Sequence, residues 1–348
     1  MNVLCIHFTE RGYNNTMKLF EELTQLFGPS GYESQVRKFI KDRVASYADE
    51  AIEDAIGNLI LVKKGYGEHK KKIMLSGHMD EIGLQVIKVE DNGMIMVKSL
   101  GCSWIYTTYQ SRVQFKNGVI GVVASRVRPE NLEGKFTNLY VDIGLSSKEE
   151  VLKYVDIGDT AIYMGSYAEL PGNHIVAKAI DDRVGCYMMM ETLMQQQQAY
   201  NDVYYVFSVQ EEVGCRGSKV TAARIQPDIG VAVDVTPGMD RPGDLEGNNT
   251  VGAGTAVKYS DTSVICDEYL VETMVNICKR DNIPFQKDVI YVGGTDASSI
   301  NLSNYGVKAC AVSVVTRYTH GPNALVSADD INASIRLLRG FIDFEFEF

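Results

Sequence analysis

Long apolar runs, disulfide-type cysteine motifs and long basic runs are all missing from this 348-residue sequence. No stretch of about eighteen consecutive apolar residues occurs, which excludes an ordinary transmembrane helix. The formal net charge is −11, and no run of more than three consecutive Lys or Arg residues occurs. The chain therefore has no electrostatic reason to bind nucleic acid or an anionic membrane surface.

Cysteine usage and the first residues point to one compartment. The seven cysteines are odd in number and form no CxxC pair, which predicts reduced thiols in a cytoplasmic protein. Residues 1–16 lack both a basic segment and a small-residue cleavage site, so they do not resemble a signal peptide. We expect them to be an N-terminal extension, because the helical pattern begins at Met17.

The two ends of the chain alternate strands with helices. We expect helices over 17–27, 33–47, 183–196, 267–281 and 328–341, and strands over 58–63, 72–76, 175–180, 203–209, 229–233 and 309–315. This alternation predicts an α/β fold, with a mixed sheet covered by helices on both faces. Its residues would be 17–83 and 174–348. The alternating tail 341–348 resembles an edge strand.

The middle of the chain follows another pattern. Residues 84–173 show short strands and turns, and only 147–154 has helical spacing. We therefore expect an inserted β-rich domain with boundaries near Gly83 and His174.

Acidic and imidazole side chains follow the expected strands at five places. Because sites in open α/β sheets form beyond the carboxyl ends of strands, these five groups can converge. They are His78 with Asp80, Asp181 with Asp182, Glu211 with Glu212, Asp234, and His320.

Each group alone has a simpler structural explanation, such as a turn, an N-cap or a core histidine. The adjacent glutamates are harder to explain, because they repel one another unless a cation binds. Two histidines and several carboxylates without cysteine suit a pair of zinc, cobalt or manganese ions. Together the five groups therefore favour a dinuclear metal site.

The motifs in order resemble the M42 family of metallo-aminopeptidases, which includes the tetrahedral (TET), glutamyl and deblocking aminopeptidases. The resemblance extends from about Met17 to the last helix. The motifs that carry it are His78-x-Asp80, 179–183 (AIDDR), 210–214 (QEEVG), Asp234-x-Thr236-Pro237-Gly238, 293–297 (GGTDA) and His320-Gly321-Pro322.

The resemblance implies a ligand for each position around two divalent ions, with zinc the first choice and cobalt or manganese the others. Asp181 would bridge the ions. His78 and Asp234 would complete the ligands of one ion, and Glu212 and His320 those of the other.

The resemblance also implies roles for residues that are not ligands. Glu211 would be the general base for the attacking water, Asp80 would hold His78 in place, and Asp182 would assist. The loop 293–297, which alone predicts a turn, would lie near the substrate, where Asp296 could contact it.

For the insert, the resemblance implies a PDZ-like domain used for dimerisation, with 140–149 and 157–159 as its signature. Dimers would assemble into a hollow dodecamer that admits short peptides. The implied function is the removal of N-terminal residues from such peptides.

Other functions remain open from the residues alone. Another dinuclear amidohydrolase, such as a deacylase, dipeptidase or carboxypeptidase, would use the same metal site. A glycosidase using Glu211 and Asp234 would leave both histidines unexplained. A non-enzymatic protein on this scaffold would be expected to have lost ligands, and none is missing.

Overall fold

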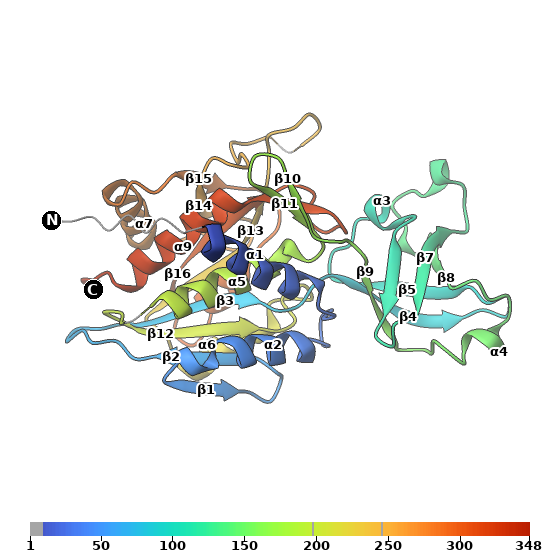
Figure 1. Ribbon diagram of the computed structural model, residues 1–348, viewed down its shortest axis with the longest axis horizontal. Helices are drawn as coiled ribbons and strands as arrows, with labels where there is room; N and C mark the ends of the chain where they lie inside the picture. Colours follow the sequence, from blue (N-terminus) through green and yellow to red (C-terminus); the bar gives the residue numbers. More distant parts are fainter. Residues whose placement is uncertain (1–9, 197, 245) are drawn as a thin grey trace.

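The computed structural model describes residues 10–196, 198–244 and 246–348, with side chains from Met17 onward. Figure 1 shows a larger body of sheet and helices, and a smaller barrel joined to it at one end.

The larger body is organised around an eight-stranded mixed sheet. From one edge to the other, its strands are β1 (Glu50–Glu53), β2 (Leu59–Lys63), β12 (Asp202–Ser208), β3 (Lys72–His78), β13 (Ile229–Pro237), β16 (Lys308–Thr316), β14 (Thr255–Ser260) and β15 (Phe285–Val289). The four central strands β12, β3, β13 and β16 are parallel to one another, whereas β2 and β14 pair antiparallel with the outer two of them. The carboxyl ends of the four central strands therefore meet at one edge.

Helices cover both faces of this sheet. They are α1 (Glu10–Gln25), α2 (Ser34–Val44), α5 (Ile180–Gln195), α6 (Arg216–Ile225), α7 (Glu268–Arg280), α8 (Asp296–Asn301) and α9 (Ala328–Ile342). Alternate residues of β3 face opposite sides, as a strand requires. Leu75 belongs to the larger core beneath α5 and α9, and Met74 to the smaller core with Ile225 of α6 and Ile300 of α8.

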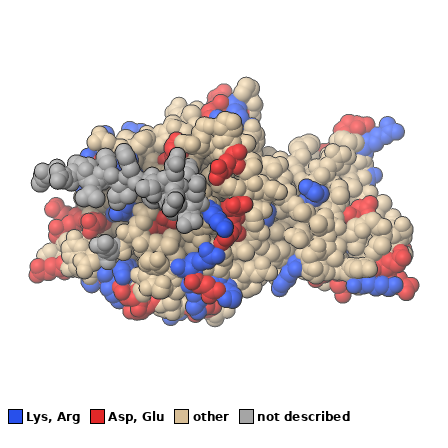
Figure 2. All heavy atoms as spheres, viewed as in Figure 1, with Lys and Arg blue, Asp and Glu red and all other residues tan. Residues whose placement is uncertain are grey.

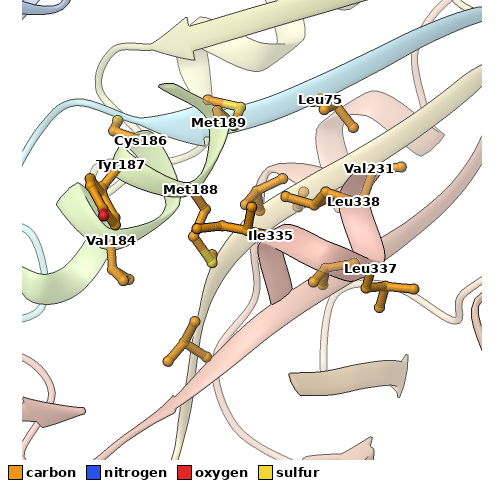
Figure 3. Packing of buried hydrophobic residues seen from close by; sticks show 14 of the residues in the cluster. Leu75, Val184, Cys186, Tyr187, Met188, Met189, Val231, Ile335, Leu337 and Leu338 are labelled. Atoms are coloured by element: carbon orange, nitrogen blue, oxygen red, sulfur yellow. The ribbon is translucent and has the colours of Figure 1, made fainter. Parts of the chain in front are cut away.

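Figure 3 shows how the larger core is packed. Met188 of α5 lies beside Ile335 of α9, Leu338 of α9 lies near Val231 of β13, and Met189 of α5 lies toward β3. All of these side chains are at least 95% buried, so α5 and α9 are held against the sheet mainly by apolar burial.

The barrel is closed by six strands in the order β4-β5-β8-β7-β6-β9. Their bounds are β4 (Gly83–Val89), β5 (Ile95–Leu100), β6 (Arg112–Phe115), β7 (Ile120–Ser125), β8 (Leu139–Asp142) and β9 (Thr160–Tyr163). Short helices α3 (Ile105–Thr108) and α4 (Lys148–Val151) lie between them. The barrel has its own core, which includes Leu84, Phe115 and Val141.

A third, three-stranded sheet lies beside the barrel connection, with β11 (His174–Ala177) between β10 (Ala168–Leu170) and β17 (Ala324–Ser327). β10 falls within the segment 84–173 but pairs with a strand that follows that segment. The predicted domain boundaries and the PDZ-like character of the insert stay predictions.

The mixed α/β architecture is confirmed, and most expected elements are present within a few residues. β13 continues through Asp234 to Pro237, so this aspartate lies within a strand and not after it. Helices α6 and α8 were not expected. α1 begins at Glu10, seven residues earlier than predicted, and residues 1–9 of the predicted extension lie outside the described residues.

The strand predicted for the tail is wrong. α9 extends to Ile342, and residues 343–348 form no strand. The side-chain amide of Asn201 donates to the carbonyl oxygens of Ile342 and Phe344, which turns the chain after the helix. Phe346 is then buried against Phe341. The alternation of apolar and acidic residues reflects this packing of the tail.

The outer surface agrees with the composition. Figure 2 shows Lys and Arg intermixed with Asp and Glu on this face, with no extended basic area. None of the helices in the described parts of the chain combines the length and apolar character needed to cross a bilayer.

Candidate active site

The five predicted groups converge at one edge of the sheet. His78 is the last residue of β3, Glu211 follows β12, and Asp234 lies in the carboxyl half of β13. His320 follows β16, and Asp181 lies at the start of α5. Parallel strand ends thus bring together residues that are up to 242 positions apart in the sequence.

Asp181 lies between the two histidines. Its Oδ1 is 3.2 Å from Nε2 of His78, and its Oδ2 is 3.2 Å from Nε2 of His320. Each carboxylate oxygen therefore faces a different imidazole, which is the arrangement expected of a bridging ligand.

His78 is oriented by its neighbours. Its Nδ1 lies 3.0 Å from the carbonyl oxygen of Asp80 and 3.5 Å from the Asp80 carboxylate. Its backbone N–H donates to Oδ2 of Asp182. Because these contacts engage Nδ1, Nε2 is left to face Asp181 and the open side. Ligand atoms of His78, Asp182 and Asp234 also lie within 4.8 Å of one another.

Asp80 organises the glutamate pair. Its Oδ1 accepts the backbone N–H of Glu211, and its Oδ2 accepts the N–H of Glu212 and the hydroxyl of Ser30. The carboxylate of Glu212 then lies 3.6 Å from Nε2 of His320, and that of Glu211 lies 3.9 Å from Nε2 of His78. One buried carboxylate thus fixes the backbone beneath both glutamates.

A buried ion network supports this edge. Oε1 of Glu81 accepts from Arg183, and both carboxylate oxygens of Glu81 accept from Lys178. Arg183 also donates to the carbonyl oxygens of Met79 and Leu23. The network ties α1 and the end of β3 to α5, which carries Asp181.

Burial and repulsion shift the acid groups upward. Burial raises the pKa of Glu212 to about 8 and that of Asp234 to about 7, with the nearby Asp181 charge adding to both. Burial also raises the pKa of Glu211 well above its ordinary value. Without a cation, this cluster therefore retains protons.

The pKa shifts of His320 and Asp181 favour the charged form of each group. Burial lowers the pKa of His320, but the charges of Glu212 and Asp181 outweigh it and raise the pKa to about 10. Burial raises the pKa of Asp181, yet the hydrogen bonds from both imidazoles hold it well below its usual value.

The residues present fit a pair of divalent cations. Two imidazoles and four carboxylates meet here, and no Lys or Arg of the described chain forms an ion pair with Asp181, Glu211, Glu212 or Asp234. Nitrogen and oxygen donors without thiolate suit zinc, cobalt or manganese. Buried carboxylates with raised pKa values are stabilised when positive charge replaces their protons.

Asp296 is placed differently from the expectation. Its Oδ2 accepts the hydroxyls of Ser76 and Ser208, its Oδ1 accepts that of Ser218, and the side chain is 1% exposed. This saturated position favours a structural role, so substrate contact by Asp296 stays a prediction without support from this geometry.

Several neighbours were not foreseen. The thiol of Cys215 lies 3.1 Å from Oε1 of Glu211, and Gly101 and Thr107 approach from the barrel. Ser30 lies between the helices expected over 17–27 and 33–47. No local pattern marks Gly101 or Thr107, because only the closure of the barrel brings them here.

Two cavities differ in their relation to this site. A narrow one is lined by Asp181, Glu212 and His320 together with Ile82 and Tyr163. A larger one of about 590 Å³ lies among Gln195, Arg280 and Arg339 and contains none of the site residues. We place the chemistry at the narrow cavity, because the predicted ligands Asp181, Glu212 and His320 line it.

Comparisons with known proteins identify the family of this chain. Residues 57–337 match the M42 glutamyl aminopeptidase family. Lysyl aminopeptidase of Pyrococcus furiosus is 30% identical over 94% of this chain and 96% of its own length. An aminopeptidase structure from Desulfurococcus kamchatkensis is 36% identical, with a TM-score of 0.90 over 95% of each chain.

A second similar structure belongs to a protein that is described as forming large assemblies. It is the TET1 peptidase of Pyrococcus horikoshii, described as assembling into a tetrahedron or a large octahedral shell. It is 29% identical, with a TM-score of 0.83 over 94% of this chain and 99% of its own. The matched family, the fold and the converging motifs agree, and the chain belongs to the M42 glutamyl aminopeptidase family.

Proposed function

We propose that this protein is a metal-dependent aminopeptidase that removes N-terminal residues from short peptides. The observation that carries the proposal is Asp181, whose two carboxylate oxygens each lie 3.2 Å from a different imidazole. Family membership supports the N-terminal end of the peptide as the site of attack.

Two divalent ions would be held by this chain, zinc first and cobalt or manganese next. His78 and Asp234 would hold one, Glu212 and His320 the other, and Asp181 both. When bound, such ions supply the positive charge that acidifies water and polarises the scissile carbonyl.

Glu211 is the residue best placed to move the proton. Its side chain is 13% exposed, and Oε1 accepts the Cys215 thiol. Asp80 fixes its backbone. The carboxylate would take a proton from the attacking water and return it to the departing amine, a role helped by its raised pKa.

We further propose a homo-oligomer, on the basis of the assembly described for TET1. A shell of subunits would limit access to short peptides. The six described cysteines are free thiols, which supports the reducing cytoplasm as the compartment.

The test uses a panel of single aminoacyl substrates, each with a free and an N-blocked amine. We expect cleavage of the free-amine substrates alone, loss of activity on chelation and recovery with zinc or cobalt. Cleavage of blocked substrates would favour a deacylase on the same site. Activity that survives chelation would contradict the proposal.

A further inference from the structure

Residues 101–108, which lie between β5 and β6 and include α3, bring part of the barrel against the candidate active site. This segment contains no residue of the predicted ligand set. Its contacts nevertheless fall on Glu212 and on the loop of His320, the two residues proposed to complete the ligands of the same ion.

Gly101 lies so close to Glu212 that a side chain at position 101 would require Glu212 to shift. A Cβ there would lie 2.9 Å from Oε2 of Glu212, 3.1 Å from its Cβ, and 2.9 Å from Cγ2 of Ile82. The backbone also has a φ of +81°, a region that glycine adopts without strain. The backbone of Gly101 thus packs directly against the Glu212 carboxylate.

Thr107 lies against His320. Its hydroxyl is 3.3 Å from the carbonyl oxygen of His320 and 3.0 Å from that of Trp104, so the two acceptors share one proton. Its Cβ and methyl group face Gly321. His320 has a φ of +57°, an unfavourable backbone for a residue with a side chain, which external contacts help to maintain.

The segment is itself anchored to the barrel. The Thr108 and Tyr163 hydroxyls are 2.9 Å apart, which links α3 to β9. The hydroxyl of Ser99 donates to the carbonyl oxygen of Gly101 and accepts the N–H of Ser103. The positions of Gly101 and Thr107 are therefore set by the barrel strands.

The opposite side of the site has other supports. In the part of the chain that the structure describes, the side-chain and non-ladder hydrogen bonds of His78, Asp182 and Asp234 all go to residues of the larger body. The barrel therefore contacts one half of the ligand set and leaves the other half to the sheet.

We propose that Gly101 and Thr107 are positioning residues that hold Glu212 and His320 in place for one of the two ions. This inference depends on the proposed function. It goes beyond that proposal by assigning the barrel a direct part in the affinity of one metal position, while the position at His78 and Asp234 is independent of the barrel.

The main test compares two glycines with the same backbone angle. Gly144 also has a φ of +81°, but a Cβ there meets nothing within 4 Å. Gly101→Ala and Gly144→Ala thus introduce similar backbone strain, and only Gly101→Ala pushes against Glu212. The proteins would be freed of metal, dialysed against buffered free zinc at the lowest concentration that fills the wild type, and analysed for zinc per subunit.

We expect two ions in the wild type, two in Gly144→Ala and one in Gly101→Ala. Two tightly held ions in Gly101→Ala would overturn the inference and leave the proposed function intact. A wild type that binds fewer than two ions would overturn the two-ion proposal, and this inference with it.

Thr107 provides a second test that does not risk the barrel fold. Thr107→Val keeps the shape but removes the hydroxyl, and Thr107→Ser keeps the hydroxyl. We expect Thr107→Val to weaken one of two zinc-binding steps about 10-fold in calorimetric titration, a change typical of partners that orient a ligand. Thr107→Ser should retain most of the wild-type affinity. Equal weakening of both steps, or no change in either, would overturn the inference.

Discussion

The two halves of the candidate metal site differ in how they are built. His78 is 2% exposed and ends a central strand, with α5 and a buried arginine behind it. The side chain of His320 is 27% exposed, sits in a loop with a left-handed backbone and is supported by a segment of the barrel. One half of the site therefore lies at the buried end of a strand, whereas the other half lies in a more exposed loop that contacts the barrel segment.

The largest expected effect concerns Glu211, whose carboxylate lies 3.9 Å from Nε2 of His78. Glu211→Gln removes the proton acceptor but retains the size of the side chain and its backbone contact with Asp80. We expect the turnover number to fall by about 10²–10⁴-fold, since positioned general bases contribute that much. Steady-state kinetics on a free-amine substrate would measure it.

The matching control is metal content, which should stay at the wild-type number of ions because Glu211 is not a proposed ligand. Activity within about three-fold of wild type would contradict the assignment of Glu211 as general base.

The rigidity of the His78 half is tested at Arg183. This guanidinium is fully buried and donates to Glu81 and to the carbonyl oxygens of Met79 and Leu23. Arg183→Met removes the donor to these carbonyl oxygens and leaves Lys178 as the remaining partner of Glu81, and we expect a loss of about 3–5 kcal/mol of unfolding free energy. Urea denaturation would measure the loss.

Arg43 provides the comparison, because it forms an exposed ion pair with Glu22. Arg43→Met should cost about 1 kcal/mol or less. Equal effects of the two substitutions would mean that the buried network does not stabilise the site.

Much of the site could be predicted from sequence because it depends on strand ends. His78, Asp181, Glu212 and His320 follow or end strands with clear apolar patterns, so their convergence could be inferred from the order of strands and helices alone. The contacts of Gly101 and Thr107 could not, since they depend on how the barrel closes and docks. The strand predicted for the tail was wrong, because an alternation of apolar and polar residues can also arise where aromatic side chains of an irregular segment pack on the core.

A smaller effect is expected from the support beneath the glutamate pair. Oε1 of Glu33 accepts the N–H groups of Gly31 and Gln210, and its side chain is 4% exposed. Burial, with the charge of Asp80 adding to it, raises the pKa of Glu33 to about 7. The folded protein thus binds this proton more tightly than the unfolded chain does.

The difference in proton affinity between the folded and unfolded chain sets how the stability changes with pH. The contribution of Glu33 to stability is complete below about pH 4.5 and is lost as the pH rises to about 7. Glu33→Gln imitates the protonated form, so its stability relative to wild type should increase by about 2–3 kcal/mol between these pH values. Denaturation of both proteins across pH would show this, and a constant difference would contradict the assignment.

The smallest effect is expected at Cys215, whose thiol contacts Glu211. Cys215→Ala removes a single weak donor and should lower the turnover number by about two- to three-fold. Cys215→Ser keeps a donor and should restore most of the activity. A similar loss in both variants would indicate that packing, and not the hydrogen bond, is responsible.

The most direct test of the account is an anomalous difference map from a crystal of the zinc-loaded protein, recorded at the zinc absorption edge. The account predicts two peaks on opposite sides of Asp181, one beside His78 and Asp234 and the other beside Glu212 and His320. A single peak, or zinc bound away from Asp181, would contradict it.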